Sequence, residues 1–167
     1  MKAFALLRSL FAMAAAAGLL SGGAARADIH VGVILSLTGP GASLGIPAGN
    51  TVKLWPAEIG GQKLKYTVLN DSTDPTEAVK AAAKLISEDH VDVIVGPSLT
   101  PASLAVLEKI AEGGTPMLSL AGGGAIVNPM GGSRRWAFKV SPPESVAVNL
   151  VLDHLLKNKG KTLATIG

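Results

Sequence analysis

Short apolar runs rich in β-branched residues alternate with helical patterns along most of this chain of 167 residues. The alternation predicts an α/β fold with an open parallel sheet rather than hairpins, because parallel neighbours need a crossover connection that a helix usually provides. Crossover helices cover both faces of such a sheet. Six runs are expected to form strands, at residues 29–35, 64–69, 91–95, 116–119, 136–140 and 162–166.

Three of the intervening segments begin with residues that favour a helix start. Asp74 is followed by a proline and, three residues on, by a glutamate, which is typical of an N-cap and a first helical turn. Thr100 precedes a proline in the same way, and residues 141–144 (Ser-Pro-Pro-Glu) have the spacing of a capping box. Residues 46–59 are less regular, because two prolines limit a helix there to about two or three turns.

The first 27 residues have the pattern of a secretory signal peptide. Lys2 and Arg8 form a positive start, residues 10–20 are mostly apolar, and Ala-Arg-Ala at 25–27 is a small-x-small cleavage site. The apolar run is shorter than the roughly 20 residues that span a bilayer. We therefore expect cleavage after Ala27 and a mature protein in the periplasm.

The composition beyond this leader excludes several classes of protein. The leader holds three of the 15 basic residues, so 12 basic residues remain against 12 acidic ones. This balance gives no electrostatic reason to expect nucleic acid or an anionic membrane as a partner. Cysteine is absent, which excludes disulfides, thiolate metal sites and cysteine nucleophiles. The 140 residues that remain after the leader's 27 are enough for one ordinary domain.

Three loops that follow predicted strands combine glycines with hydroxyl groups. They cover residues 36–45, 96–101 and 119–124. In an open parallel sheet, ligands bind beyond the carboxyl ends of the strands, so these loops form the candidate site. Backbone N–H groups bared by glycines, hydroxyl donors and the positive end of a helix suit a small anion such as a carboxylate.

Thr100 is the first candidate for the contact with such an anion. Its position also fits an N-cap whose oxygen binds its own helix, and the two roles are compatible if the hydroxyl donates outward. The same loop offers Ser98 as a second hydroxyl. The glycines at 122–124 also fit a plain turn, and Glu144 fits the far end of its capping box better than a ligand contact.

Few residues support catalysis or a metal. His30, His90 and His154 fall at a strand start, before a strand and on a helix, so no shared site is implied. Asp71 and Asp74 fit turn and cap roles better than a metal pair. No nucleophile elbow, His-Glu-x-x-His or P-loop occurs. We therefore expect a protein that is not an enzyme and holds no metal or cofactor.

Several short motifs follow one another in a characteristic order from residue 29 to residue 167. They are Leu-Thr-Gly-Pro at 37–40, the connection from Asn-Asp to Asp-Pro at 70–75, Val-Gly-Pro at 95–97, Thr-Pro-Met-Leu-Ser at 115–119 and Arg-Arg-Trp-Ala-Phe-Lys at 134–139. In this order the chain resembles the type I periplasmic solute-binding proteins of ABC importers, in particular the leucine/isoleucine/valine-binding branch. The resemblance implies a Rossmann-like α/β lobe.

The resemblance also implies roles for individual residues. Thr100 would contact the carboxylate of the solute, and Ala121 would offer backbone groups to an amino acid head. Ser119 and Gly122 would lie beside Ala121. These positions together imply the capture of a small solute that carries a carboxylate.

Two positions depart from the amino-acid-binding members of the family. Gly123 stands where those members carry a second hydroxyl, and Leu44 stands where they can present an aromatic side chain. The implied solute is therefore a branched-chain or other amino acid, or an aromatic acid.

Proteins of this family have two similar lobes that close around the ligand. By resemblance, residues 28–160 form the N-terminal lobe, and residues 161–167 are the first strand of a second lobe that is missing from a truncated sequence. The implied partners are the small-molecule solute and the membrane subunits of an ABC importer.

Two other interpretations remain open on the sequence alone. The glycines between residues 39 and 45 loosely resemble a dinucleotide-binding fingerprint, and Asp71 could then meet a ribose. Three features weigh against this enzyme domain. The glycine spacing is not Gly-x-Gly-x-x-Gly, Pro47 interrupts the following helix, and the chain carries an export signal. The other interpretation is the sensory ectodomain of a receptor with the same lobe fold.

Overall fold

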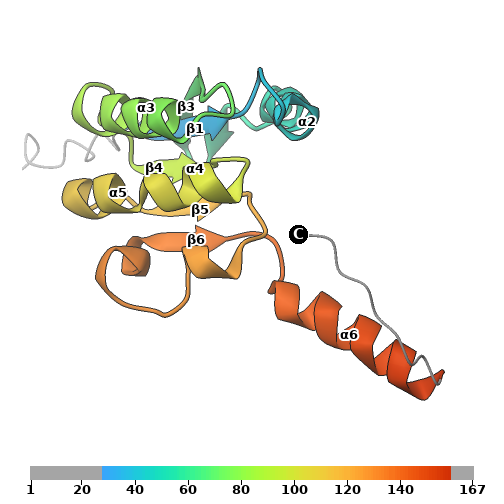
Figure 1. Ribbon diagram of the computed structural model, residues 1–167. Helices are drawn as coiled ribbons and strands as arrows, with labels where there is room; N and C mark the ends of the chain where they lie inside the picture. Colours follow the sequence, from blue (N-terminus) through green and yellow to red (C-terminus); the bar gives the residue numbers. More distant parts are fainter. Residues whose placement is uncertain (1–27, 159–167) are drawn as a thin grey trace, which may run out of the picture.

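The strands form one mixed sheet in which most neighbours are parallel (Figure 1). The computed structural model describes residues 28–158, and its strand order is β2-β3-β1-β4-β5-β6. The strands are β1 (Ile29–Leu35), β2 (Glu58–Ile59), β3 (Gln62–Asn70), β4 (Val93–Val95), β5 (Met117–Ser119) and β6 (Ala137–Lys139). The helices are α2 (Ala42–Val52), α3 (Pro75–Ser87), α4 (Thr100–Ala105), α5 (Leu107–Gly113) and α6 (Glu144–Lys157), with 3-10 turns η1 (Gly124–Ile126) and η2 (Gly132–Trp136). The predicted α/β class is confirmed.

β1 lies inside the sheet and pairs in parallel with β3 on one side and β4 on the other. Its central Val33 is in register with Val68 of β3 and Val95 of β4. The chain goes from β1 to β3, returns past β1 to β4 and then adds β5 and β6, so the strand order reverses between β1 and β4. Five of the six predicted strands occur, and the sixth, 162–166, lies outside the described residues.

A short hairpin at one edge of the sheet was not expected. β2 pairs antiparallel with β3, with Glu58 opposite Lys63 and Ile59 opposite Gln62. Gly60 and Gly61 form the two-residue connection, and both have positive φ angles, 58° and 78°. Two consecutive positive φ angles are the requirement of a type I′ hairpin turn, which glycine meets most easily. The expectation of a sheet without hairpins was therefore wrong at this edge.

Helix α2 begins and ends earlier than the expected segment of residues 46–59. It starts at Ala42 and runs through Pro47, which lacks the N–H that would bond to the carbonyl of Ser43. Ser43 and Pro47 are both exposed, so water can bind the freed carbonyl. The predicted interruption of the helix by Pro47 was therefore wrong.

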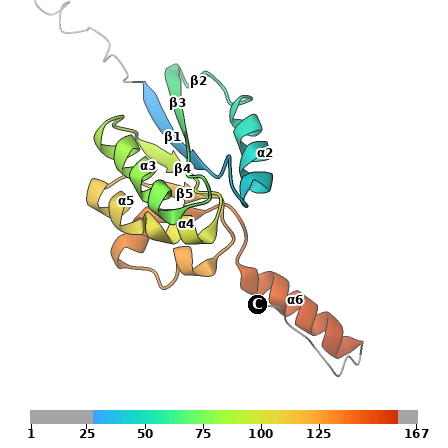
Figure 2. The same cartoon turned by 45° about the horizontal axis from the view of Figure 1, so that its top comes forward.

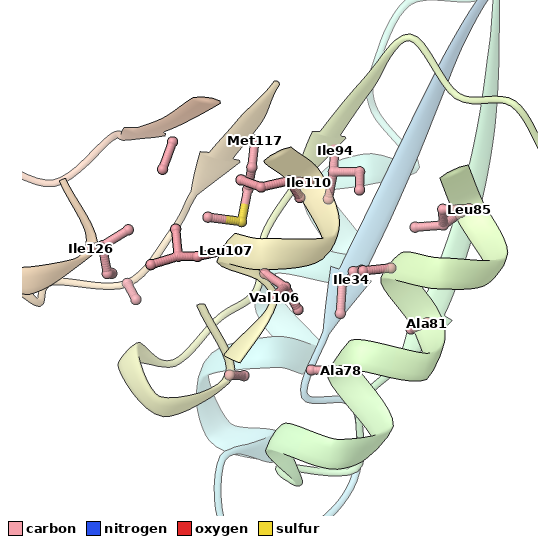
Figure 3. Packing of buried hydrophobic residues seen from close by; sticks show 14 of the residues in the cluster. Ile34, Ala78, Ala81, Leu85, Ile94, Val106, Leu107, Ile110, Met117 and Ile126 are labelled. Atoms are coloured by element: carbon pink, nitrogen blue, oxygen red, sulfur yellow. The ribbon is translucent and has the colours of Figure 1, made fainter. Parts of the chain in front are cut away.

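Helices α3, α4 and α5 cover one face of the sheet, and their apolar side chains form the larger core cluster (Figure 3). Leu85 of α3 and Ile110 of α5 are fully buried there against Ile34 and Ile94 of the central strands. The alanines of α3 at positions 78, 81 and 82 are also buried, and their small side chains bring the helix close to the sheet. This packing fixes the carboxyl ends of β1 and β4 relative to each other.

Helix α2 lies on the opposite face of the sheet, where a smaller cluster gathers around Val31, Val33 and Leu35 (Figure 2). Helices therefore lie on both faces, as predicted. Helix α6 projects away from the sheet in both views and has no buried residue (Figures 1 and 2). Within residues 28–158, no helix has both the length and the apolar character needed to cross a bilayer.

The predicted N-cap of α3 is confirmed. The Asp74 carboxylate accepts hydrogen bonds from the N–H groups of Thr76 at 2.6 Å and Glu77 at 3.1 Å. Hydrogen bonds from the Glu77 and Thr76 N–H groups lower the pKa of Asp74 below its usual 3.8. The charged form of Asp74 is therefore the form that stabilises this helix start.

We expect Asp74→Asn to keep the cap and to lose part of the acid dependence of stability. Because the folded-state pKa of Asp74 is lowered, its contribution is present above the unfolded-state value and is lost as the pH falls through the lower folded-state value. Asparagine caps equally well and does not titrate in this range. Denaturant midpoints measured from neutral pH into the acid range should fall less steeply for Asp74→Asn than for the parent. Equal slopes would contradict this assignment.

Candidate functional site

The three candidate loops meet at the carboxyl edge of the sheet, where the strand order reverses. The loop after β1 joins the loop after β4 through the Ser36 N–H, which donates to Ser98 Oγ at 3.3 Å. The loop after β5 joins the loop after β4 through Leu120 N–H, which donates to the Pro97 carbonyl at 3.2 Å. Three loops that are far apart in sequence thus form one surface.

Two glycines allow this close approach of the loops. Gly96 has a φ of +102°, and a Cβ there would lie 2.0 Å from the carbonyl oxygen of Ile34. A Cβ at Gly45 in α2 would lie 2.0 Å from the carbonyl oxygen of Ser36. Both collisions are with backbone, which cannot turn aside as a flexible side chain can. Only glycine therefore fits at these two positions.

Thr100 is not the N-cap of its helix, so that part of the prediction was wrong. The cap position belongs to Leu99, whose extended backbone has φ −121° and ψ 150°, and Thr100 is the first residue of α4. Its Oγ1 instead accepts a hydrogen bond from the Gly123 N–H at 3.2 Å. Since α4 has only six residues, we assign no anion-binding role to its N-terminus. Both branches of the Thr100 side chain, the hydroxyl and the methyl group, lie against Gly123 of the glycine-rich loop.

Ser119 is fully buried and serves the fold of the loop rather than its surface. Its Oγ lies 2.8 Å from Ser103 Oγ and accepts the Ala121 N–H at 3.1 Å. Ser103, on the buried side of α4, was not among the predicted residues. These contacts turn the chain sharply after β5 and place Ala121 and the glycines that follow next to Thr100.

The segment Ala121 to Gly124, which we call the glycine loop, is held by side chains at each of its four residues. Ser141 Oγ donates to the Ala121 carbonyl at 2.8 Å, and Lys139 Nζ donates to the Gly122 carbonyl. Thr100 accepts from Gly123, and Glu144 Oε2 accepts from the Gly124 N–H at 3.2 Å. The glycines alone fit a plain turn, but in the structure side chains hold this loop from both sides.

The capping box predicted for residues 141–144 is absent from this helix start. Pro143 occupies the cap position of α6 and makes no side-chain cap bond. Because α6 begins only at Glu144, Ser141 stands too far ahead of the helix to cap it, and Ser141 and Glu144 bind the glycine loop instead. Lys139, Ser141 and Glu144 were missed as site residues, because nothing local in the sequence indicates their partners.

The remaining predicted site residues lie at the margins of this surface. Ser98 is buried, with 7% of its surface exposed, and its Oγ accepts a hydrogen bond from the Ser36 N–H. Leu44 lies in the first turn of α2, and its side chain is 58% exposed. The loop that leads into this turn packs on the loop after β4, because a Cβ at Gly41 would lie 2.8 Å from Leu99 Cδ1. Leu44 therefore lies in the first turn of α2, just after the part of the chain that packs against the loop after β4.

The acid needed for a dinucleotide site is not available. Asp71 is fully buried, and its Oδ1 accepts the Thr73 N–H at 2.9 Å, as expected of a turn residue. A carboxylate without exposed surface cannot reach the ribose of a bound nucleotide. Although α2 continues through Pro47, the burial of Asp71 and the spacing of the glycines between residues 39 and 45 do not fit a dinucleotide-binding domain.

His30 is held by contacts within the fold and lies away from the candidate loops. Its ring nitrogens lie 2.8 Å from the Asp89 carbonyl oxygen and 2.8 Å from Thr67 Oγ1, at the opposite end of β1 from the candidate loops. Within residues 28–158, no three His, Cys, Asp or Glu side chains are grouped so that they could hold a metal ion.

A hollow in the described residues lies away from the glycine loop. It measures about 630 Å³ and runs between α2 and the outer side of β3, where Trp55, Tyr66 and Val68 line it. Its lining is mainly apolar, and none of the candidate carboxylate contacts takes part. The glycine loop and Thr100 lie outside this hollow, and Gly122 is exposed, so we describe them as an open wall.

Comparison with known proteins agrees with the fold and with the order of the motifs. Residues 28–167 match the family described as periplasmic binding protein. The chain belongs to this family. The resemblance inferred from the sequence is thereby confirmed, and membership associates the protein with the periplasm.

Three relatives show how much of the family's length this chain represents. The Leu/Ile/Val-binding protein homolog 3 of Brucella melitensis is 29% identical over 96% of this chain and 44% of its own length. An extracellular ligand-binding receptor from Rhodopseudomonas palustris HaA2 is 41% identical with a TM-score of 0.77, over 80% of this chain and 37% of its own. A solute binding protein of an ABC transporter from Rhodopseudomonas palustris BisB5, in complex with 3,4-dihydroxy benzoic acid, is 26% identical with a TM-score of 0.72, over 78% and 36%. The chain thus spans less than half the length of each relative, and all three are described as binding proteins or receptors rather than enzymes.

Gly123→Ala should damage the site, whereas Gly122→Ala should be tolerated. A Cβ at Gly123 would lie 2.3 Å from Thr100 Cγ2, whereas a Cβ at Gly122 would meet only Glu144 Oε1 at 3.7 Å. Overpacking of this kind costs about 1–3 kcal/mol. Denaturant unfolding should show that loss for Gly123→Ala alone, and adding Thr100→Ser, which removes Cγ2, should recover part of it. Equal stability of the two alanine variants would contradict the close packing.

Proposed function

We propose that this protein is the solute-binding component of an ABC importer and captures a small carboxylate-bearing solute in the periplasm. The observation that carries the proposal is the pairing of Thr100 with the glycine loop beside the reversal of strand order. Open α/β sheets bind ligands at this edge. Family membership supports the transport role.

Two donors of this wall have the chemistry to hold a carboxylate. Thr100 Oγ1 accepts the Gly123 N–H, and this leaves its own hydrogen to donate outward. Gly122 is exposed, and its N–H has no partner among the described residues. A carboxylate oxygen accepts strongly from hydroxyl and N–H donors. Thr100 and Gly122 therefore form the proposed carboxylate contact, and Ala121 and Gly123 shape it.

The solute class follows from the side chains that this wall lacks. Gly123 offers no hydroxyl for a ligand, and its close contact with Thr100 leaves no room for one. Leu44 adds an apolar side chain at the margin. Relatives are named for binding Leu, Ile and Val or were solved with 3,4-dihydroxy benzoic acid. We infer a branched-chain or other amino acid, or an aromatic acid, as the solute.

The proposal places the described residues in one of two lobes. The open wall of Thr100 and the glycine loop needs a second surface to exclude water from the solute, and a similar lobe beyond residue 160 would supply it. The same proposal includes the membrane subunits of an importer as partners, which would receive the closed, loaded protein.

The exported protein should begin at Asp28. Cleavage after Ala27 requires small residues at positions 25 and 27, so Ala27→Asp should block processing and Ala27→Ser should permit it. N-terminal sequencing of the periplasmic fraction distinguishes these outcomes. A secreted protein that retains Met1 would show that residues 1–27 are not a cleaved leader.

Thr100→Val should weaken solute binding, and Thr100→Ser should preserve it. Valine removes the hydroxyl that we propose for the carboxylate, and the loss of a hydrogen bond to a charged group lowers affinity by about ten- to a hundredfold. Titration calorimetry on the full-length mature protein with L-leucine, L-isoleucine and 3,4-dihydroxybenzoate measures the change. Thr51→Val, a change on exposed α2, serves as the control and should bind as the parent does. Unchanged affinity of Thr100→Val would remove Thr100 from the site.

A further inference from the structure

The glycine loop is held largely by the chain segment that leads out of the sheet. Lys139 is the last residue of β6, and Glu144 is the first residue of α6. Lys139 binds the carbonyl of Gly122, Glu144 binds the N–H of Gly124, and Ser141 between them binds the carbonyl of Ala121. Three of the five side chains that bind the loop thus come from residues 139–144, which we call the exit segment, and the other two are Thr100 and Ser119.

We propose that Lys139 and Glu144 are positioning residues that make the shape of the carboxylate contact depend on the path of the exit segment. The solute part of this inference rests on the proposed function, whereas the control of the loop does not. Neither side chain would need to touch the solute.

The polarity of each contact supports a role in positioning. An ammonium group meets a carbonyl oxygen and a carboxylate meets an N–H, so both are charge-assisted hydrogen bonds of the stronger kind. Neither Lys139 nor Glu144 is part of an ion pair in the described residues, so each charge acts on the loop rather than on the other. The half-buried Lys139 and the exposed Glu144 thus both direct their charged groups to the backbone of the glycine loop.

The geometry of the loop couples the path of the exit segment to the position of the Gly122 N–H. Gly123 lies between the two anchored glycines, and its own N–H is held by Thr100 on the opposite side. A change in the direction of the exit segment would pull on Gly122 and Gly124 together and turn the Gly122 N–H relative to the Thr100 hydroxyl. By reciprocity, a solute that binds both donors would favour one path of the exit segment.

The experiment uses hydrogen–deuterium exchange and calorimetry on the full-length mature protein. Glu144→Ala and Lys139→Met remove the two anchors, while Glu144→Gln and Lys139→Arg keep an acceptor and a donor. Asp153→Ala, on the exposed part of the same helix, is the matched control. Without solute, both anchor-removing variants should speed amide exchange across residues 121–124 by about three- to tenfold, the effect of one lost hydrogen bond. The conservative variants and Asp153→Ala should exchange as the parent does.

Calorimetry with L-leucine and 3,4-dihydroxybenzoate then tests the coupling. Glu144→Ala should lower the affinity of the compound that binds the parent by about three- to tenfold, and Glu144→Gln should restore it. Combining Glu144→Ala with Thr100→Val should cost less than the sum of the single effects, because both act on one loop.

Each contrary result has a distinct meaning. Unchanged exchange in Glu144→Ala and Lys139→Met would overturn the positioning role, and this measurement needs no solute. Faster exchange with parental affinity in Glu144→Ala, while Thr100→Val binds weakly, would overturn the coupling and leave the proposed function standing. Normal binding by Thr100→Val, with faster exchange in the anchor variants, would count against the proposed site and not against control of the loop. Affinity that falls steeply with salt in the parent but not in Lys139→Met would overturn the positioning role of Lys139 by showing a direct ion pair with the solute.

Discussion

The contact between the backbones of β1 and β4 determines where every candidate residue lies. Gly96 approaches the Ile34 carbonyl so closely that a Cβ would lie 2.0 Å from that oxygen. This approach brings Ser98 to Ser36 and sets the start of α4, from which Thr100 reaches the glycine loop. Without it, the loops after β1, β4 and β5 would be three separate turns rather than one surface.

The fold could be predicted wherever its cause is local in the sequence. The Asp74 cap and the β-branched apolar run of β1 depend on residues within a few positions of each other, and both occur as expected, as does the alternation of strands with helices. The hairpin at Gly60 and Gly61 also has a local cause, two glycines between short strands, and its two-residue strand β2 was too short to recognise. The boundaries of the elements were predicted less well. Helix α2 begins at Ala42 rather than at residue 46, because packing against the sheet decides where it begins.

The candidate site was predictable in its place and not in its contacts. Glycine and hydroxyl content pointed to three loops that do meet at one edge of the sheet, but the partner of Thr100 lies 23 residues away and the partner of Glu144 lies 20 residues away. Local rules assigned both residues to helix caps, since a cap is the nearest possible partner in sequence. In the folded chain, Thr100 and Glu144 instead bind backbone N–H groups of the glycine loop, and they do not form the helix caps that were predicted from nearby residues.

The composition of the glycine loop follows from these contacts rather than from a need for flexibility. Gly123 must lack a Cβ because Thr100 occupies that space, and the loop turns tightly because side chains hold its backbone on both sides. A loop of larger residues could not pack against Thr100 on one side and against the exit segment on the other. Its glycines therefore serve close approach, and the order of the loop is supplied by Lys139, Ser141 and Glu144. In a wall that is otherwise open, these contacts hold the Gly122 N–H in place relative to the Thr100 hydroxyl, the two donors of the proposed carboxylate contact.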